Sequence, residues 1–429
     1  MSKYSTIFLF PSALGFLFAT ALRRAGKKAL VISRPSAKAD PMPDIVGAAV
    51  YIPDIFVQDM AYFGLPEPAI DPRRPYSLNI AGREVLIEPD KARQMLAYAH
   101  AIPDLDRQLM RLVERLDAAS ERMMPKLRAS YQASPGKRSL GHRLAKRSRL
   151  FPFRSDPLNQ LQRNTDGDIA RWALHLPAYL SLGIQGADGG FKGIAAGYGL
   201  RSPYISSLNI AKLAVEAEHL YLGEGCDVIE ANDRSEIALN FAGGANSAEI
   251  DGAEVVFDKI FIGKDIAAHT LSKNGPVAPR LHGLTSLSQS FTWTPPRGRG
   301  LSAPRDGVIV MDINRPPIND NLVMYSINPA MEFSTVTAAI ALERDETMSE
   351  HFVQRRRGHL LGRMVSNFAA VMGGKAEIAA LSAAKTYPSI KVTGRAKFRL
   401  LDDSVTPGCT IEDVVRYARW LSLRSEFSL

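Results

Sequence analysis

The chain has 429 residues, of which 46% are hydrophobic and 23% are charged, an ordinary composition for a globular protein of two or three domains. Its two cysteines, Cys226 and Cys409, are too few for a disulfide framework or a cysteine-based zinc site. The N-terminus lacks the basic region and cleavage pattern of a signal peptide, and no stretch reaches the ~20 apolar residues of a membrane span. We therefore expect a cytoplasmic protein.

The net charge of +9 arises from 53 basic and 44 acidic residues, and much of the excess lies in residues 137–154. The basic residues of this segment are Lys137, Arg138, Arg143, Lys146, Arg147, Arg149 and Arg154. Only Phe151 and Phe153 are aromatic there, too few to stack on nucleic-acid bases, so we expect no nucleic-acid partner. We predict an exposed basic insertion, and contact with an acidic protein surface or an anionic membrane surface is the alternative.

The first 33 residues predict a strand-helix-strand unit. Residues 6–9 form an apolar run typical of a buried strand, residues 14–24 indicate a helix that Ala25-Gly26 ends, and residues 30–32 indicate a second strand. A strand, a tight turn, a helix and a parallel strand are the unit that opens a dinucleotide-binding domain.

The phosphate-binding fingerprint of such a unit is incomplete here. Its three glycine positions, counted back from the helix end, fall on Phe10, Ser12 and Gly15, and the acidic position falls on Ser33. Phe10 places a side chain where the tight turn needs a bare backbone, while Ser12 is small and Gly15 keeps close helix packing. Ser33 offers one hydroxyl in place of a carboxylate that would accept both ribose hydroxyls. The scaffold is retained, but the ligand contacts are damaged.

The remaining chain alternates helices with short strands. We expect a helix within residues 47–65, strands at 76–80 and 83–87, a long helical stretch over 90–128, and a helix over 209–222. A meander follows, with a turn at Asp251-Gly252 and a last strand over 257–262 that re-enters the sheet. Later elements are strands at 289–294, 307–313 and 321–327, a helix over 345–372, a strand over 389–394, and a final helix that begins with a capping box at Thr410–Asp413.

This order of elements resembles the two-domain flavin oxidoreductases of the phytoene desaturase and amine oxidase type. The stretches that carry the resemblance are residues 6–33, 47–65, 209–262 and 390–420. The resemblance implies an α/β fold, in which a Rossmann-like FAD/NAD(P)-binding domain of the glutathione-reductase-2 type carries an inserted α+β substrate domain. The first domain would comprise residues 1–90, 205–270 and 375–429, and the second residues 91–204 and 271–374.

The resemblance also places the family's cofactor site on this sequence. Besides Ser12, Gly15 and Ser33, it falls on Gly394-Arg395, where the family has a glycine and an acidic residue at the chain that links the flavin to the nucleotide. Pro407-Gly408 resembles the family's Pro-Gly at the isoalloxazine, and the Gly-Gly before the central helix is replaced by Leu208-Asn209. Arginine is still a good phosphate partner. With several contacts changed, we predict that FAD binds weakly or not at all.

Other chemistry is weakly indicated. The histidines are not spaced as metal ligands, and neither a nucleophile-elbow motif nor a phosphate-binding loop is present, so we assign no metal site and no catalytic residue. The lone histidines His175, His219, His269 and His282 are interpreted as structural or surface residues. Asp402-Asp403 is interpreted as a polar turn, and acid–base chemistry at a flavin edge is its alternative.

Three functions remain open at this point. The first is a degenerate, non-catalytic relative of these flavoenzymes that acts as an accessory subunit in a hetero-oligomer, beside an active flavoenzyme homologue or another enzyme of its pathway. The second is a divergent FAD-dependent oxidoreductase that oxidises or desaturates an amine-like or apolar molecule. The third is a carrier of an apolar ligand, since the Rab escort and GDP-dissociation-inhibitor proteins use a related fold.

Overall fold

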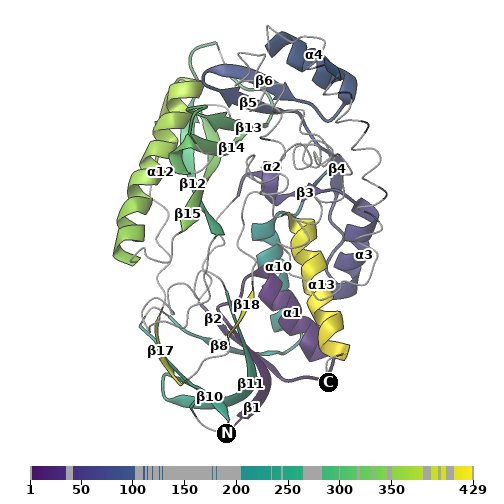
Figure 1. The fold of residues 1–429 in the computed structure, drawn as a ribbon, viewed down its shortest axis with the longest axis vertical. Helices are drawn as coiled ribbons and strands as arrows, with labels where there is room; N and C mark the ends of the chain where they lie inside the picture. Colours follow the sequence, from purple (N-terminus) through teal and green to yellow (C-terminus); the bar gives the residue numbers. More distant parts are fainter. Residues whose placement is uncertain are drawn as a thin grey trace.

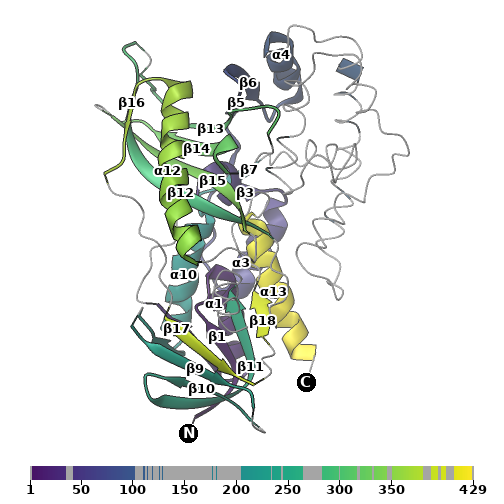
Figure 2. The same ribbon diagram turned by 60° about the vertical axis from the view of Figure 1, so that its left-hand side comes forward.

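The computed structural model describes residues 2–34, 42–101, 204–232, 234–242, 245–263, 283–298, 300–315, 319–330, 333–344, 350–379, 388–394, 398–401 and 410–427, with scattered residues between 110 and 180. Two large sheets, each with helices packed against it, lie at opposite ends of the molecule (Figures 1 and 2). The predicted basic insertion at 137–154 lies outside the described residues. Among the described residues, no helix is both long and apolar enough to cross a bilayer.

An eight-stranded sheet forms the unit that contains the N-terminus (Figure 1). Its spatial order is β17 (Ser389–Thr393), β9 (Glu236–Asn240), β10 (Asn246–Ile250), β11 (Ala253–Gly263), β1 (Ser2–Leu9), β2 (Ala29–Ser33) and β8 (Asp227–Glu230), with β18 (Phe398–Leu401) also paired to β11. β1 runs parallel to both β2 and β11. Helix α1 (Ala13–Arg24) connects β1 to β2, which confirms the strand-helix-strand unit expected from the first 33 residues.

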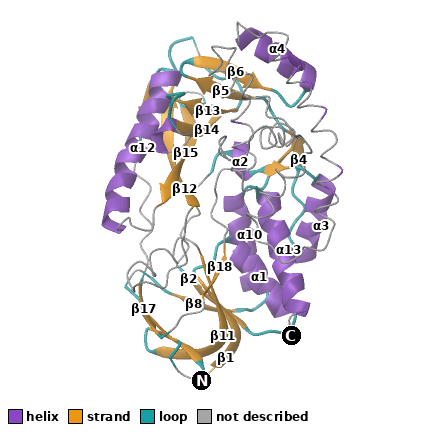
Figure 3. Ribbon diagram, in the orientation of Figure 1, coloured by secondary structure: helices purple, strands orange, loops and turns teal. Residues whose placement is uncertain are grey.

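Four helices cover one face of this sheet, as their shared core shows (Figure 3). They are α1, α3 (Pro53–Phe63), α10 (Ile210–Gly223) and α13 (Ile411–Phe427). Because side chains alternate along a strand, Phe8 points toward these helices while Ile7 and Leu9 belong to the core on the other face. The ring of Phe8 stacks on that of Phe261 with centroids 5.3 Å apart, which joins β1 and β11 beneath α1.

The meander predicted from the sequence continues this sheet, and its apolar side chains share the core on the other face. β9, β10 and β11 are antiparallel neighbours, and the turn between β10 and β11 contains Asp251 (φ 48°) and Gly252 (φ 86°). Two consecutive positive φ values are typical of a tight hairpin turn. The second half of β11 then pairs in parallel with β1, which confirms that the meander re-enters the sheet.

A buried ion cluster attaches the last helix to α3. The side chain of Asp59 is 1% exposed, and its Oδ1 accepts hydrogen bonds from Arg416 and Arg419 at 2.7 and 2.6 Å. On the neighbouring pair of helices, the Arg24 guanidinium at the end of α1 donates two hydrogen bonds, of 2.8 and 2.5 Å, to Glu224 at the end of α10. The helices are therefore fixed to one another by ion pairs as well as by apolar packing.

A seven-stranded sheet forms the second unit. Its order is β16 (Lys375–Glu377), β12 (Gly283–Thr294), β15 (Ser334–Arg344), β14 (Leu322–Asn328), β13 (Arg305–Val310), β5 (Tyr76–Ile80) and β6 (Arg83–Ile87). A short 3-10 helix, η1 (Asn319–Asn321), precedes β14, and α4 (Lys91–Ala101) packs on β6. Helix α12 (Glu350–Met372) covers one face, where the ring of Phe368 lies 5.2 Å from that of Tyr325.

Strands β5 and β6 change the expected division of the chain. We expected residues 1–90 in the dinucleotide-type domain, but β5 pairs in parallel with β13, and β6 pairs with β5. Both strands therefore belong to the second sheet. Their local sequence is compatible with either sheet, and only a partner more than 200 residues later in the chain selects one. The remaining domain boundaries stay a prediction.

A small three-stranded sheet lies between the two units (Figure 1). Its strands are β3 (Ala49–Val50), β7 (Tyr204–Ser206) and β4 (Ile70–Pro72), and both outer strands are antiparallel to β7. The one-turn helix α2 (Asp44–Gly47) precedes β3. These segments bring residues from the first 75 positions next to the start of α10, and the hollows described below lie around them.

Candidate functional site

The turn between β1 and α1 forms without its first glycine. Phe10 adopts a left-handed backbone conformation (φ 50°), is 8% exposed, and donates its backbone N–H to the carbonyl of Ile32 at 2.8 Å. This conformation is unfavourable by about 1–2 kcal/mol for a residue with a side chain. Burial of the ring offsets that strain. The guanidinium of Arg34 lies over the ring, 5.6 Å from its centroid.

Gly15 is required by close packing rather than by its own backbone angles. A methyl group at this position would lie 2.3 Å from Cβ of Pro11 and 3.1 Å from Cδ1 of Leu401. Ser12 is the exposed N-cap residue of α1, but its side chain makes no capping hydrogen bond to the helix. Gly15 thus keeps the role of the third fingerprint glycine, which is close packing of the helix against its neighbours, while Phe10 and Ser12 stand at the other two glycine positions.

Ser33 ends β2 and is 6% exposed. Its carbonyl accepts a hydrogen bond from Ala231 at 2.8 Å, and its register partner on β8 is Glu230, whose side chain is exposed. The structure therefore places the Glu230 carboxylate next to Ser33, which stands where the fingerprint has its acidic residue. No sequence pattern pointed to Glu230, because its place next to Ser33 depends on the β2–β8 pairing.

The C-terminal part of the expected site needs a correction. Gly394 was expected at the end of the last strand before α13, but that strand is β17, which pairs with β9 at the sheet edge. A further strand, β18, follows and pairs with β11 in the middle of the sheet. Gly394 (φ 88°) instead makes the turn that leaves β17, where a Cβ would lie 2.6 Å from the backbone nitrogen of Ala242. Arg395 and Asp402-Asp403 lie outside the described residues.

The start of α13 follows the prediction. Thr410 accepts a hydrogen bond from the backbone N–H of Asp413 at 3.2 Å, and its hydroxyl donates to the Asp413 carboxylate at 3.1 Å. The expected capping interaction is therefore confirmed. Glu412 is fully buried and accepts the backbone N–H groups of Tyr51 and Ile52 at 2.8 and 3.1 Å, which holds the segment after β3 against the helix. Pro407-Gly408, just before this helix, lie outside the described residues.

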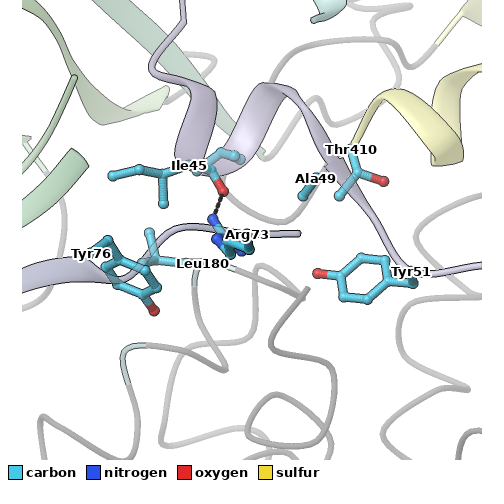
Figure 4. A pocket seen from close by; sticks show the side chains of 8 residues that line it. Ile45, Ala49, Tyr51, Arg73, Tyr76, Leu180 and Thr410 are labelled. Atoms are coloured by element: carbon cyan, nitrogen blue, oxygen red, sulfur yellow. Dashed lines mark hydrogen bonds between the residues drawn. The ribbon is translucent and has the colours of Figure 1, made fainter. Parts of the chain in front are cut away.

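Figure 4 shows the hollow beside the start of α13. The side chain of Arg73 extends between Tyr51 and Tyr76 and donates to the carbonyl of Ile45 on α2. Its guanidinium carbon lies 5.1 Å from the centroid of the Tyr76 ring. The cavity that remains is about 10 Å³, room for about one water molecule. Pockets that bind small molecules have volumes of roughly several hundred Å³, so this cavity is much smaller than such a pocket.

A larger, open cleft lies next to this small cavity. Its volume is about 470 Å³, and its wall includes Asp44, Arg74, Lys212, Asp306 and Ser326. α2 contributes Asp44 to the cleft and its next two residues to the small cavity, so this one-turn helix separates the two hollows. The sequence analysis named none of these residues, because they come from distant segments that only the tertiary structure brings together.

Asp306 is a titratable group of this cleft with a perturbed pKa. Burial raises the pKa of its carboxyl group above the ordinary value, and the charge of Asp44 raises it further, while a hydrogen bond with Ser326 and the guanidinium groups of Arg73 and Arg74 lower it. A carboxyl group with a raised pKa in a cleft is a candidate functional residue. The available sequence signal was an aspartate at the start of an otherwise apolar strand.

The other candidates from the sequence are not brought together. His219 is exposed on α10, while His175, His269 and His282 lie outside the described residues. In the part of the chain that the structure describes, no three His, Cys, Asp or Glu side chains are grouped so that they could hold a metal ion.

Comparison with known proteins identifies the fold. The sequence matches no protein-family model and no curated protein. Wild-type putrescine oxidase bound to putrescine matches with a TM-score of 0.51 and 13% identity, over 99% of this chain and 98% of that one. A triple mutant from a redesign of cofactor binding in putrescine oxidase matches with a TM-score of 0.51, 11% identity and the same coverage. An oxidoreductase from Methanosarcina mazei matches with a TM-score of 0.49 and 11% identity, over 97% of this chain and 99% of that one.

The chain has the fold of putrescine oxidase. This confirms the expected fold class, a Rossmann-like FAD/NAD(P)-binding domain with an additional α+β domain, and the amine-oxidase side of the resemblance at the level of fold.

The fold of putrescine oxidase implies FAD, but the described residues of the β1–α1 turn do not fit a dinucleotide. Phe10 places a side chain at the position of the first fingerprint glycine, and Pro11 has no N–H to donate to a phosphate. We therefore derive no chemical step that uses this cofactor.

Proposed function

We propose that this protein uses the fold of a flavin oxidoreductase as a binding subunit, without a working FAD site and without catalysing redox chemistry itself. The observation that carries the proposal is the β1–α1 turn, where Phe10 and Pro11 replace a bare backbone. The apolar body around this turn is fully packed, with Ala13 and Leu14 each 1% exposed. The apolar packing around the turn is thus intact, whereas the residues that would contact a dinucleotide differ from the fingerprint.

The test is flavin content. We expect the full-length protein, expressed in a flavin-replete host, to emerge from gel filtration colourless and to show no saturable FAD binding by fluorescence quenching. A matched variant restores the fingerprint with Phe10→Gly, Pro11→Ala, Ser12→Gly and Ser33→Glu, and its FAD affinity should exceed that of the wild type. Stoichiometric FAD retained by the wild-type protein would overturn the proposal.

A binding subunit needs a partner, and we propose a stable hetero-oligomer with a flavoenzyme of the same fold. The net charge of +9, concentrated in residues 137–154, favours a partner with an acidic surface. A stable interface should bury at least about 1,000 Å² of total surface. Co-expression with candidate partners, followed by light scattering, is the measurement. A monomer with every candidate, together with turnover of an amine by the protein alone, would contradict the accessory role.

One observation favours a second candidate, a divergent flavoenzyme. The exposed carboxylate of Glu230, the register partner of Ser33, stands close to where the fold places its ribose contact. In that case FAD should bind, and Glu230→Gln should weaken it at least about tenfold, because charge-assisted hydrogen bonds to the ribose are lost. If the wild type binds no FAD, this candidate is excluded.

A further inference from the structure

Two arginines from different segments share one buried carboxylate in the second unit. The side chain of Asp320, in η1, is 6% exposed, and its two oxygens lie 3.0 and 2.6 Å from the Nη2 atoms of Arg315 and Arg363. Arg315 follows β13, and its carbonyl accepts Nδ2 of Asn321 at 3.0 Å. Arg363 lies on α12, where Asn367 donates to the carbonyl of Asp320 at 2.8 Å. Both arginines are therefore fixed to η1, and their guanidinium groups are held close together.

These two guanidinium groups keep most of their hydrogen-bonding capacity. The side chains of Arg315 and Arg363 are 46% and 51% exposed, and each contacts Asp320 through Nη2. A guanidinium has five N–H donors, and among the described residues no second acceptor contacts either group. α12 forms the outer layer of the second sheet (Figure 1), so the remaining donors are accessible from outside.

The surface around the pair carries an excess of positive charge. Arg356 is also held by η1, and Arg355 beside it is exposed. The sequence contains no acidic residue over positions 351–376. On the loop after β13, the carboxylate of Asp312 accepts a backbone N–H of its own turn. Four arginines of this surface therefore stand against two described carboxylates, those of Asp312 and Asp320.

A buried arginine adds to this excess. Arg357 on α12 is 9% exposed, and its Nε and Nη2 atoms are buried without a hydrogen-bond partner. Buried charges in proteins are ordinarily paired, and solvent ions screen them less than exposed ones. The positive potential of this part of α12 is therefore only partly compensated by the described residues.

We propose that the arginine cluster, defined as Arg315, Arg356 and Arg363, binds a phosphate group, either free or carried by a small molecule. A phosphate monoester has close to two negative charges and three acceptor oxygens, so it can accept from two guanidinium groups at once and offset the local excess. A carboxylate has one charge and pairs with a single guanidinium fork. Asp320 would hold the two arginines from inside, and the phosphate would bridge them from outside. The inference is independent of flavin binding, because no residue of the cluster belongs to the β1–α1 turn.

The experiment is calorimetric titration of the full-length protein in a buffer free of phosphate and sulfate. The probes are glycerol 3-phosphate, inorganic phosphate, and glycerate, which carries a carboxylate in place of the phosphate. We expect saturable binding at one site, with the preferred phosphate at least about tenfold tighter than glycerate. Tighter binding of the ester would support a phosphorylated small molecule, and tighter binding of inorganic phosphate would support the free ion. Absence of binding by both phosphates, or glycerate binding equally well, would overturn the proposal.

Arg363→Gln tests the pair directly. It should weaken phosphate binding at least about tenfold, because charge-assisted hydrogen bonds are lost. Glutamine is a good helix former, so α12 should persist. The matched control is Arg355→Gln, an exposed site on the same helix with the same charge change, which should weaken binding less than about threefold because solvent screens a charge that does not contact the ligand.

Arg315→Gln repeats the test from a second segment. This residue lies in a loop, so its loss of phosphate binding does not depend on the integrity of α12, and the loss should match that of Arg363→Gln. If Arg355→Gln weakened binding as much as these two variants, binding would follow net charge and not the arginine pair, and the proposal would be refuted. Wild-type affinity in both Arg315→Gln and Arg363→Gln would refute it as well.

Discussion

Gly15→Ala introduces a methyl group 2.3 Å from Cβ of Pro11 and 3.1 Å from Cδ1 of Leu401. Carbon atoms attract one another at about 3.5–4.0 Å, so both contacts are repulsive. The Pro11 ring is fixed to the backbone next to the strained Phe10, and Leu401 is 1% exposed, so neither can move away without a shift of the turn or the core. Overpacking of this kind destabilises by about 1–3 kcal/mol. The better helix propensity of alanine offsets about 1 kcal/mol of this destabilisation.

We therefore expect Gly15→Ala to lower the free energy of unfolding by up to about 2 kcal/mol, measured by urea denaturation followed by circular dichroism. The matched control is Gly362→Ala, inside α12, where a methyl group would meet no atom within 4 Å. This control should be stabilised by up to about 1 kcal/mol. Equal effects of the two substitutions would show that the β1–α1 turn yields to the added methyl group and that close packing does not require a glycine at position 15.

Three further outcomes are expected. Asp59→Asn should destabilise the protein by about 3 kcal/mol in the same urea assay, because it leaves two largely buried arginines of α13 without a charged partner. The control, Asp258→Asn at an exposed ion pair, should change the stability by less than about 0.5 kcal/mol. Because the pKa of Asp306 is raised on folding, the stability linked to this carboxyl is present below its unfolded pKa of about 3.8 and is lost as the pH rises through the folded value. Asp306→Asn should therefore gain stability relative to the wild type as the pH rises above about 3.8. Limited trypsin digestion, read by mass spectrometry, should cut first within residues 137–154, and resistance there would show that this segment is packed.

The elements that the sequence predicted best are those set by local patterns. The first strand-helix-strand unit, the helix α10, the turn at Asp251-Gly252 and the capping interaction of Thr410 were all visible in short windows and agree with the structure. The overall fold class followed from the order of these elements. Periodicity and caps depend on residues within about four positions, so one sequence is sufficient to find them.

The features that the sequence could not predict depend on distant partners. Residues 389–394 look like a strand, but whether it lies at the sheet edge or beside β11 is decided by pairing with β9. The role of Gly15 depends on Leu401, which is far away in the sequence. The cleft residues Lys212 and Asp306 carry no local signature, because the site they share exists only after the two sheets are in place.

The position of β1 constrains the order in which the chain can fold during synthesis. β1 pairs with β11, which ends at Gly263, and α1 is then covered by α13, which starts at Ile411. At roughly 5–20 residues per second, the ribosome needs on the order of 10–50 s to supply β11 after β1 has been made. During that time the apolar face of α1 lacks its native cover. A nascent chain of this protein is therefore a natural client for ribosome-associated chaperones, and chains truncated before α13 should aggregate.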